Sequence, residues 1–357
     1  MRRWMKQVVF SLALCLVLCA CRDNTAPPAG SVPEPEVSQP GVSLPEAEPL
    51  PYTNPLTGEG SAVDLAQNRP IAVMINNLKK ALPQLGISQA DIIYEVLAEG
   101  EITRMLAVFQ SVEQVETIGS VRSARDYYVS LAAGLDAIFL HAGGSPGAYN
   151  AIYNWSVTAL DCVNGPYEGT LFWRDAERKK SAGYEHSVLT SGEKITQLLP
   201  TYTKLRLEHE DGYTAPFSFT ADGTPAGGLP AQTITVPFST YKTGIFTYDQ
   251  ETGLYCVSQY GAPYEDGNDG AQVAVRNVLV LYASMKVIDR EGRLSVGLVG
   301  SGTGQFACGG QIVDITWEKP SNTGPMTFYT ADGQVLELGV GRSYINVVST
   351  GTAITVA

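Results

Sequence analysis

The chain has 357 residues, of which 44% are apolar and 36 are glycine, and this composition is typical of a globular protein long enough for two domains. The formal net charge is −12, so the surface repels the phosphates of nucleic acid and the headgroups of an anionic bilayer. Nucleic acid is therefore excluded as a partner, and so is docking on an anionic membrane by charge alone.

The first twenty residues have the layout of an export signal. Arg2, Arg3 and Lys6 precede an almost wholly apolar run, residues 8–20, that is too short to span a bilayer. The segment Leu18-Cys-Ala-Cys21 resembles the lipobox of bacterial lipoproteins, which implies cleavage after residue 20 and acylation of Cys21. The alternative is an uncleaved anchor helix. In both cases we expect a protein anchored on the extracytoplasmic face of the cell membrane.

Residues 21–52 form a predicted tether. Its many prolines remove backbone donors and fix φ, and its glutamates repel one another, so we expect an extended segment that packs against nothing. The predicted organisation is a signal peptide at 1–20, a lipidated tether at 21–52, an N-terminal domain at 53–200 and a C-terminal domain at 201–357.

The N-terminal half mixes strands and helices. Apolar runs of strand length predict strands at 70–75, 92–98, 105–109 and 137–140. One helix is predicted to begin at Ser123, the first residue of a capping-box pattern that ends at Asp126. A second helix is predicted to begin at Ser145-Pro146, where serine suits the N-cap and proline the first helical position.

From about residue 204 onward, turns, glycine and β-branched residues dominate. Strands are predicted at 233–236, 245–248, 254–258, 278–282, 294–299, 312–317, 327–330 and 335–338. Asp332-Gly333 predicts a hairpin between the last two. The chain is therefore predicted to be an α+β protein, with a mixed α/β N-terminal domain followed by a mostly β C-terminal domain.

The cysteine and glycine patterns indicate no metal, cofactor or phosphate-binding site. Cys162, Cys256 and Cys308 follow the tether with spacings that fit no metal site, so we expect neither a metal nor a cofactor. Cys256 and Cys308 lie in strand-like sequence and either form one disulfide or stay free. The run Gly300–Gly304 lacks the lysine of a phosphate-binding loop and is interpreted as a tight turn or bulge between strands.

Charged residues of the N-terminal half form a candidate anion site: Glu95, Glu99, Arg104, Arg122 and Arg125. Guanidinium forks bind carboxylate and phosphate groups, and a helix that begins at Ser123 would add free backbone N–H donors. Alternation along a hairpin predicts that Glu95 and Glu99 point the same way. The alternative is structural: the glutamates pair with the arginines and fix the hairpin to the helix.

Two further patterns bear on catalysis. Gly143–Gly147 matches the G-x-S-x-G nucleophile elbow, but Pro146 lacks the backbone N–H that would complete an oxyanion hole, and Ser145 fits an ordinary N-cap. His141 is interpreted as a core histidine or as a partner of His186 and Arg174 in an acid–base pair. The residues expected to converge on one concave surface are Glu95, Arg122, Arg125 and His141.

Several motifs in one order carry a family resemblance: Arg69–Asn77, Ala90–Glu95, Glu99–Arg104, Ser120–Arg125, His141–Ser145, Val299–Gly304 and Asp314–Lys319. Together they resemble the YerB-like lipoproteins of Gram-positive bacteria, whose two-part domain has no established reaction. The resemblance spans roughly 54–348 and implies this fold and location. Tyr184-Glu185-His186 departs from the family, which usually has proline directly before the histidine. Asn76 and Asn77 of the first motif join the candidate ligand-binding residues.

Two function classes follow from these patterns. The first is a non-enzymatic binding or accessory lipoprotein whose partner is a cell-wall component or an envelope protein, and we favour it because no residue set requires catalysis. The second is an envelope hydrolase or transferase that uses Glu95 or Glu99, His141 and His186 in an N-terminal cleft. The test between them is whether these side chains share one open cleft or are paired and sealed.

Overall fold

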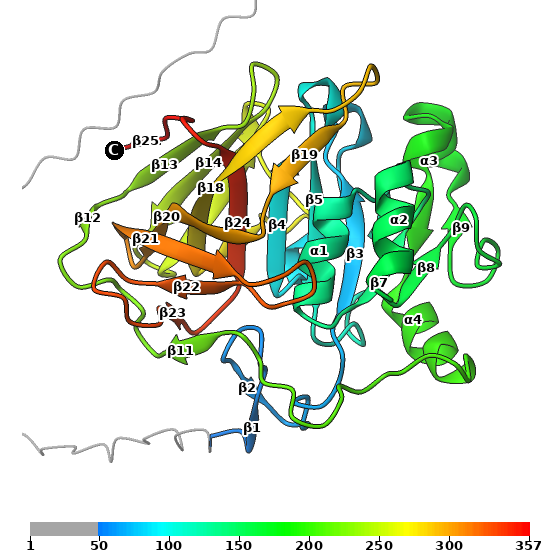
Figure 1. Ribbon diagram of the computed structural model, residues 1–357, viewed down its shortest axis with the longest axis horizontal. Coiled ribbons are helices and arrows are strands. Elements are labelled where there is room, and N and C mark those ends of the chain that lie inside the picture. Colours follow the sequence, from blue (N-terminus) through cyan, green and yellow to red (C-terminus); the bar gives the residue numbers. More distant parts are fainter. Residues whose placement is uncertain (1–48) are drawn as a thin grey trace, which may run out of the picture. The chain divides into compact units, whose positions relative to one another are not determined.

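A twelve-stranded mixed sheet takes strands from both halves of the sequence (Figure 1). The computed structural model describes residues 49–357, so the predicted signal peptide, Cys21 and the tether up to residue 48 lie outside the described residues. The main strands, in order across the sheet, are β12 (Leu229–Pro230), β21 (Gln311–Lys319), β20 (Gly300–Cys308), β18 (Asn277–Val287), β24 (Ser343–Ser349), β4 (Ile92–Leu97), β5 (Thr103–Phe109), β3 (Ile71–Asn76), β7 (Ile138–His141) and β8 (Ala159–Asp161). β19 (Leu294–Gly297) pairs with β18, and β22 (Thr327–Tyr329) pairs with β21.

The middle of this sheet joins the two halves of the sequence. β24 pairs in parallel with β4 on one side, where Asn346 lies opposite Glu95, and with β18 on the other. β3, β7 and β8 also run parallel, so their carboxyl ends meet at one edge. The domain boundary at residue 200 remains a prediction. Strands from both sides of this position are hydrogen-bonded within the same sheet.

Each face of the sheet has its own hydrophobic core. Neighbouring side chains alternate between faces, so Val73 belongs to one core and Met74 to the other. One core includes side chains of α1 (Asp126–Gly134) and α2 (Pro146–Asn154), which lie together in front of β3 and β7 in Figure 1. The core on the opposite face includes side chains of a second sheet and of α4 (Gly192–Leu198).

The remaining elements are short. The second sheet has the order β16 (Ala262–Pro263), β15 (Leu254–Gln259), β14 (Thr243–Asp249), β13 (Thr233–Pro237) and β25 (Thr355–Val356), with β17 (Ala274–Val275) against β15. Three smaller sheets pair β6 (Ile118–Gly119) with β10 (Val188–Thr190) and β9 (Trp173–Arg174), β1 (Tyr52–Thr53) with β2 (Gly60–Ser61), and β11 (Ser218–Thr220) with β23 (Glu337–Gly339). Helix α3 is Ala176–Ser181, and 3₁₀ turns lie at Lys79–Ala81, Ile87–Gln89, Glu99–Glu101, Tyr184–His186 and Leu199–Thr201. Among the described residues, no helix combines the length and the hydropathy needed to cross a membrane.

The predicted α+β class is confirmed, with a mixed N-terminal region and a sheet-rich C-terminal region. The predicted strands of the first half and the helix at Ser145 are present within one or two residues. The prediction for Ser123 is wrong, because α1 begins at Asp126 with Arg125 as its N-cap. Ser123 accepts a hydrogen bond from Arg104 and Ala124 donates one to Gly143, so these residues are held extended before the helix.

One prediction for the second half is also wrong. Gly300–Gly304 lies inside β20 and pairs with β21 throughout, because glycine lets the strand approach Trp317: a Cβ on Gly302 would lie 2.5 Å from that ring. The hairpin at Asp332-Gly333 is present in a short form: Tyr329 forms an antiparallel bridge with Val335, the Thr330 N–H donates to the Gln334 carbonyl and the Leu336 N–H to the Phe328 carbonyl. Beyond it, β23 pairs with β11. The three cysteines Cys162, Cys256 and Cys308 are free.

Candidate functional site

A cavity of about 480 Å³ lies beyond the carboxyl ends of β7 and β8, and four arginines line it: Arg104, Arg122, Arg125 and Arg174. The carboxyl ends of parallel strands are a common place for ligand sites in α/β layers. The loop between β6 and α1 supplies Arg122, Ser123 and Arg125. Backbone bonds from Arg122 to Met74 and from Ala124 to Gly143 hold this loop against β3 and the β7–α2 loop.

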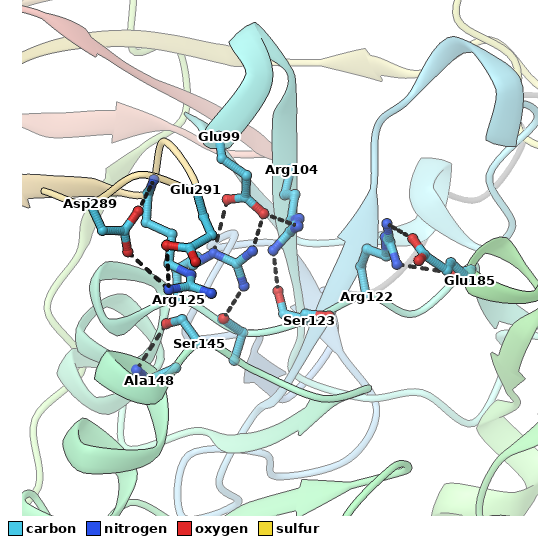
Figure 2. Close-up of polar contacts among 12 residues, drawn as sticks. Glu99, Arg104, Arg122, Ser123, Arg125, Ser145, Ala148, Glu185, Asp289 and Glu291 are labelled. Carbon is cyan, nitrogen blue, oxygen red and sulfur yellow. Dashed lines mark hydrogen bonds and ion pairs between the residues drawn. The ribbon is translucent and has the colours of Figure 1, made fainter. Parts of the chain in front are cut away.

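Glu99 pairs with two of these arginines (Figure 2). Its Oε1 lies 2.7 Å from Nη2 of Arg104 and also accepts from Nη2 of Arg125, while its Oε2 accepts from Nε of Arg125 at 3.0 Å. Arg104 is only 4% exposed and also donates to the Ser123 carbonyl at 2.8 Å. A Cβ on Gly292, in the β18–β19 turn, would lie 4.0 Å from Glu99 Cβ, so this turn of the second half borders the cluster.

A single 3₁₀ turn covers the other two arginines. Arg122 donates from Nη2 to the Glu185 carboxylate at 2.7 Å and from Nη1 to the Glu185 carbonyl at 3.3 Å. Arg174 donates from Nη1 to the Tyr184 carbonyl at 3.1 Å, and its guanidinium carbon lies 3.8 Å from the centre of the Tyr184 ring. Glu168 accepts from Nε of Arg174 at 2.9 Å.

The charges of this cluster reinforce one another. Burial alone would raise the pKa of Glu99, but the charge of Arg104 and the hydrogen bonds from Arg125 lower it to about 2. Burial and the nearby Arg125 lower the pKa of Arg104 to about 10. The hydrogen bond from Arg122 lowers the pKa of Glu185. Glu99, Arg104 and Glu185 are therefore ionised at neutral pH.

Glu95 is not part of this cavity, and the prediction that it points the same way as Glu99 is wrong. Its side chain is fully buried in the opposite core, where its carboxylate lies 2.9 Å from Nζ of Lys242 and accepts from the Tyr344 hydroxyl at 2.5 Å. Asn77 and Thr103 also donate to it. Residues 99–101 leave the strand in a 3₁₀ turn, so the alternation that holds through β4 ends before Glu99.

The histidines also lie outside the cavity lining. His141 is 1% exposed, its Nδ1 lies 2.9 Å from the Gly143 carbonyl, and burial lowers its pKa. His186 pairs with the amide of Asn76 at 2.6 Å, and burial followed by the charge of Arg122 lowers its pKa. The predicted convergence of Glu95, Arg122, Arg125 and His141 therefore fails at Glu95 and His141, which are sealed. Arg122 and Arg125 do share the cavity.

Ser145 acts as a helix cap. Its side chain accepts from the Ala148 N–H at 3.1 Å, at the start of α2, and Pro146 occupies the first turn (Figure 2). This is the N-cap arrangement predicted from the sequence. The hydrogen bond from Ala148 engages the Ser145 hydroxyl oxygen, which a nucleophile elbow would leave exposed.

Comparison with known proteins places the chain in a family. Residues 56–204 match the model described as "Protein of unknown function (DUF3048) N-terminal domain", and residues 234–345 match the corresponding C-terminal domain. The chain belongs to the DUF3048 family. The Bacillus subtilis (strain 168) protein described as "Putative lipoprotein YerB" is 36% identical over 299 residues, 82% of this chain and 85% of that protein. The crystal structure of the YerB protein from Bacillus subtilis matches with a TM-score of 0.74 at 32% identity, covering 85% of this chain and 99% of that one.

The resemblance to YerB-like proteins that the motifs predicted is thus confirmed. The fold of this DUF3048 member also shows site residues that the sequence did not reveal. Tyr149 donates to Asp161 at 2.8 Å and lines the cavity with Asn164. Glu185 lines it as well, from the segment that departs from the family pattern. Tyr149 could have been predicted as a site residue from its position in the first turn of the helix that follows Ser145.

Proposed function

We propose that this protein is a membrane-anchored extracytoplasmic lipoprotein that binds an anionic component of the cell envelope and acts as a binding or accessory protein without catalysis. Two observations support the anchor: the lipobox-like segment ending at Cys21, and the printed description of the Bacillus subtilis relative as a lipoprotein. The binding role is supported by the cavity at the carboxyl ends of β7 and β8.

One observation carries the binding role: four arginines line this cavity, and three glutamates pair with them, namely Glu99, Glu185 and, outside the lining, Glu168. Arg104 is nearly sealed, yet its Nε has no hydrogen-bond partner among residues 49–357. Leaving a buried donor unsatisfied costs about 1–3 kcal/mol. An anion bound beside the guanidinium groups would offset this cost electrostatically.

The distribution of the titratable groups favours binding over acid–base catalysis. A hydrolase or transferase of the kind considered above needs Glu95 or Glu99 in one cleft with His141 and His186. Of these four, only Glu99 lines the cavity, and both of its oxygens are occupied by arginines.

Co-sedimentation tests the binding role. The purified full chain is pelleted with isolated Gram-positive cell walls, and Arg122→Gln is expected to weaken binding about tenfold, because a hydrogen bond to a charged group contributes about 1.5 kcal/mol or more. Arg122 is chosen because it is partly exposed and lies outside the buried pair of arginines. The exposed Lys204, which does not line the cavity, provides the matched charge control as Lys204→Gln. Equal binding by Arg122→Gln and wild type would contradict the proposal.

Cell fractionation tests the anchor. Cys21→Ala is expected to move the protein from the membrane fraction to the soluble fraction or to leave it unprocessed, because the thiol that would carry the acyl chains is absent. Normal cleavage after residue 20 combined with unchanged membrane retention would contradict a lipoprotein.

A further inference from the structure

We infer that the ligand group held in this cavity is a phosphate ester rather than a carboxylate, which rests on the proposed function. The cavity carries one positive charge in excess, since four arginines face the carboxylates of Glu99 and Glu185 and a third carboxylate, Glu168, pairs with Arg174. A phosphate monoester carries a charge of about −1.5 to −2 at neutral pH, whereas a single carboxylate carries one charge. The charge excess therefore favours binding of an anion, and the hydrogen-bond geometry distinguishes the phosphate from the carboxylate.

The hydrogen-bond geometry points the same way. A planar carboxylate is recognised best by one guanidinium fork that offers two parallel N–H groups. The Nε and Nη2 fork of Arg125 is already taken by Glu99. Both terminal nitrogens of Arg122 bind Glu185, and Arg174 uses Nε for Glu168 and Nη1 for Tyr184. An incoming carboxylate would therefore have to displace a protein group to obtain a fork.

Single donors remain on several arginines. A guanidinium has five N–H groups, and the hydrogen bonds within residues 49–357 use two each on Arg104, Arg122 and Arg174. These arginines come from three separate segments, namely β5, the β6–α1 loop and β9. Donors that converge from several anchors suit the three acceptor oxygens of a phosphate ester. The Ser123 side chain, which also lines the cavity, adds a hydroxyl donor.

The apolar and aromatic side chains at the mouth of the cavity favour a phosphate ester over inorganic phosphate. Val163 and Tyr184 line it and are 52% and 55% exposed. With Tyr149 they provide apolar and aromatic surface beside the charges. The cavity of about 480 Å³ is larger than a phosphate group needs, so it has room for the attached organic group. A phosphorylated polyol and the phosphate monoester headgroup of phosphatidic acid share this chemistry.

Calorimetric titration of the full chain in detergent micelles tests the inference. The probes are glycerol 1-phosphate for a polyol phosphate, dihexanoyl phosphatidic acid for a lipid headgroup, inorganic phosphate, and succinate as the carboxylate, all at one ionic strength. We expect at least one ester to bind ten or more times more tightly than succinate and more tightly than inorganic phosphate. The ester that binds more tightly shows whether the natural ligand is a polyol phosphate or a lipid headgroup. Arg122→Gln should weaken ester binding about tenfold and Ser123→Ala severalfold, while Lys204→Gln should leave it unchanged.

The outcomes separate the inference from the proposed function. Tighter binding of succinate than of both esters, at a site weakened by Arg122→Gln, would overturn the phosphate inference and leave an anion-binding protein. Ester binding that Arg122→Gln and Ser123→Ala do not change would overturn the assignment of this cavity. No binding of any anion by a chain with an unchanged melting temperature would overturn both.

Discussion

Glu99 holds together two arginines that would otherwise repel each other beneath the cavity. Its side chain is 23% exposed, and the side chains of Arg104 and Arg125 are 4% and 8% exposed. Without the carboxylate, two nearly buried cations would face each other, and such unpaired buried charges are strongly destabilising. Glu99 is therefore a structural part of the cavity wall.

The contribution of Glu99 depends on pH in a defined direction. Its pKa is about 2 in the folded chain, below its ordinary value of 4.5, so the unfolded chain binds more protons in between. The stabilisation is complete above about pH 5 and is lost as the pH falls toward 2. We expect Glu99→Gln to lower the free energy of unfolding by about 1–3 kcal/mol at pH 7, and we expect this difference from wild type to shrink at acid pH.

Urea titrations of both proteins at pH 7, 5 and 3 measure the effect. The isosteric change keeps the shape of the side chain, and Glu116→Gln, at an exposed position, is the control for a lost surface charge. A difference between Glu99→Gln and wild type that is the same at pH 7 and pH 3 would contradict the assignment of the low pKa to this group.

At the scale of elements, α2 depends on its cap. The Ser145 side chain satisfies the Ala148 N–H, which has no intrahelical partner in the first turn. Ser145→Ala is expected to lower the free energy of unfolding by about 1 kcal/mol and to leave anion binding unchanged. Chemical denaturation and the calorimetric titration measure both. Loss of binding or of an enzymatic activity without loss of stability would instead indicate that the hydroxyl acts on a ligand.

Local patterns predicted most elements but only part of the site. Apolar runs such as 70–75 and 105–109 became β3 and β5, because a buried strand needs little beyond a continuous apolar stretch. The orientation of Glu99 could not be predicted, because the 3₁₀ turn at Glu99–Glu101 interrupts the alternation. The start of α1 was missed because long-range hydrogen bonds to Ser123 and Ala124 override the capping-box pattern.

The pairing of strands from the two halves of the chain could not be predicted from the sequence either. Parallel pairing joins β24 to β18, whose paired residues Asn277 and Ser343 are 66 positions apart, and to β4, whose residue Ile92 is 251 positions from Ser343. Strand composition does not specify such distant partners. Glu95 illustrates the consequence: it was assigned to the cavity by its neighbours in sequence, but its buried partner is Lys242, between β13 and β14. Only the three-dimensional pairing shows that this carboxylate belongs to the core.

At the scale of the whole molecule, the Glu95–Lys242 pair ties the halves together. Both side chains are 1% exposed, so removing one partner leaves a buried charge without the opposite charge beside it. Lys242→Met is expected to lower the free energy of unfolding by about 3–5 kcal/mol, and the double variant Glu95→Gln/Lys242→Met is expected to lose less than the sum of the single variants. A double-mutant cycle in urea measures the coupling. Strictly additive effects would show that the pair makes no net contribution.

The position of β24 sets the order in which this protein can complete its fold. Tyr344 of β24 and its partner Glu95 are 249 residues apart, and β24 separates β4 from β18 in the sheet. At about 5–20 residues per second of synthesis, β4 would present an unpaired edge for roughly 10–50 seconds before β24 is made. Unpaired edges invite pairing with other chains. A chain that emerges N-terminus first, at the ribosome or at the membrane, therefore exposes this edge of β4 until its final strands are present.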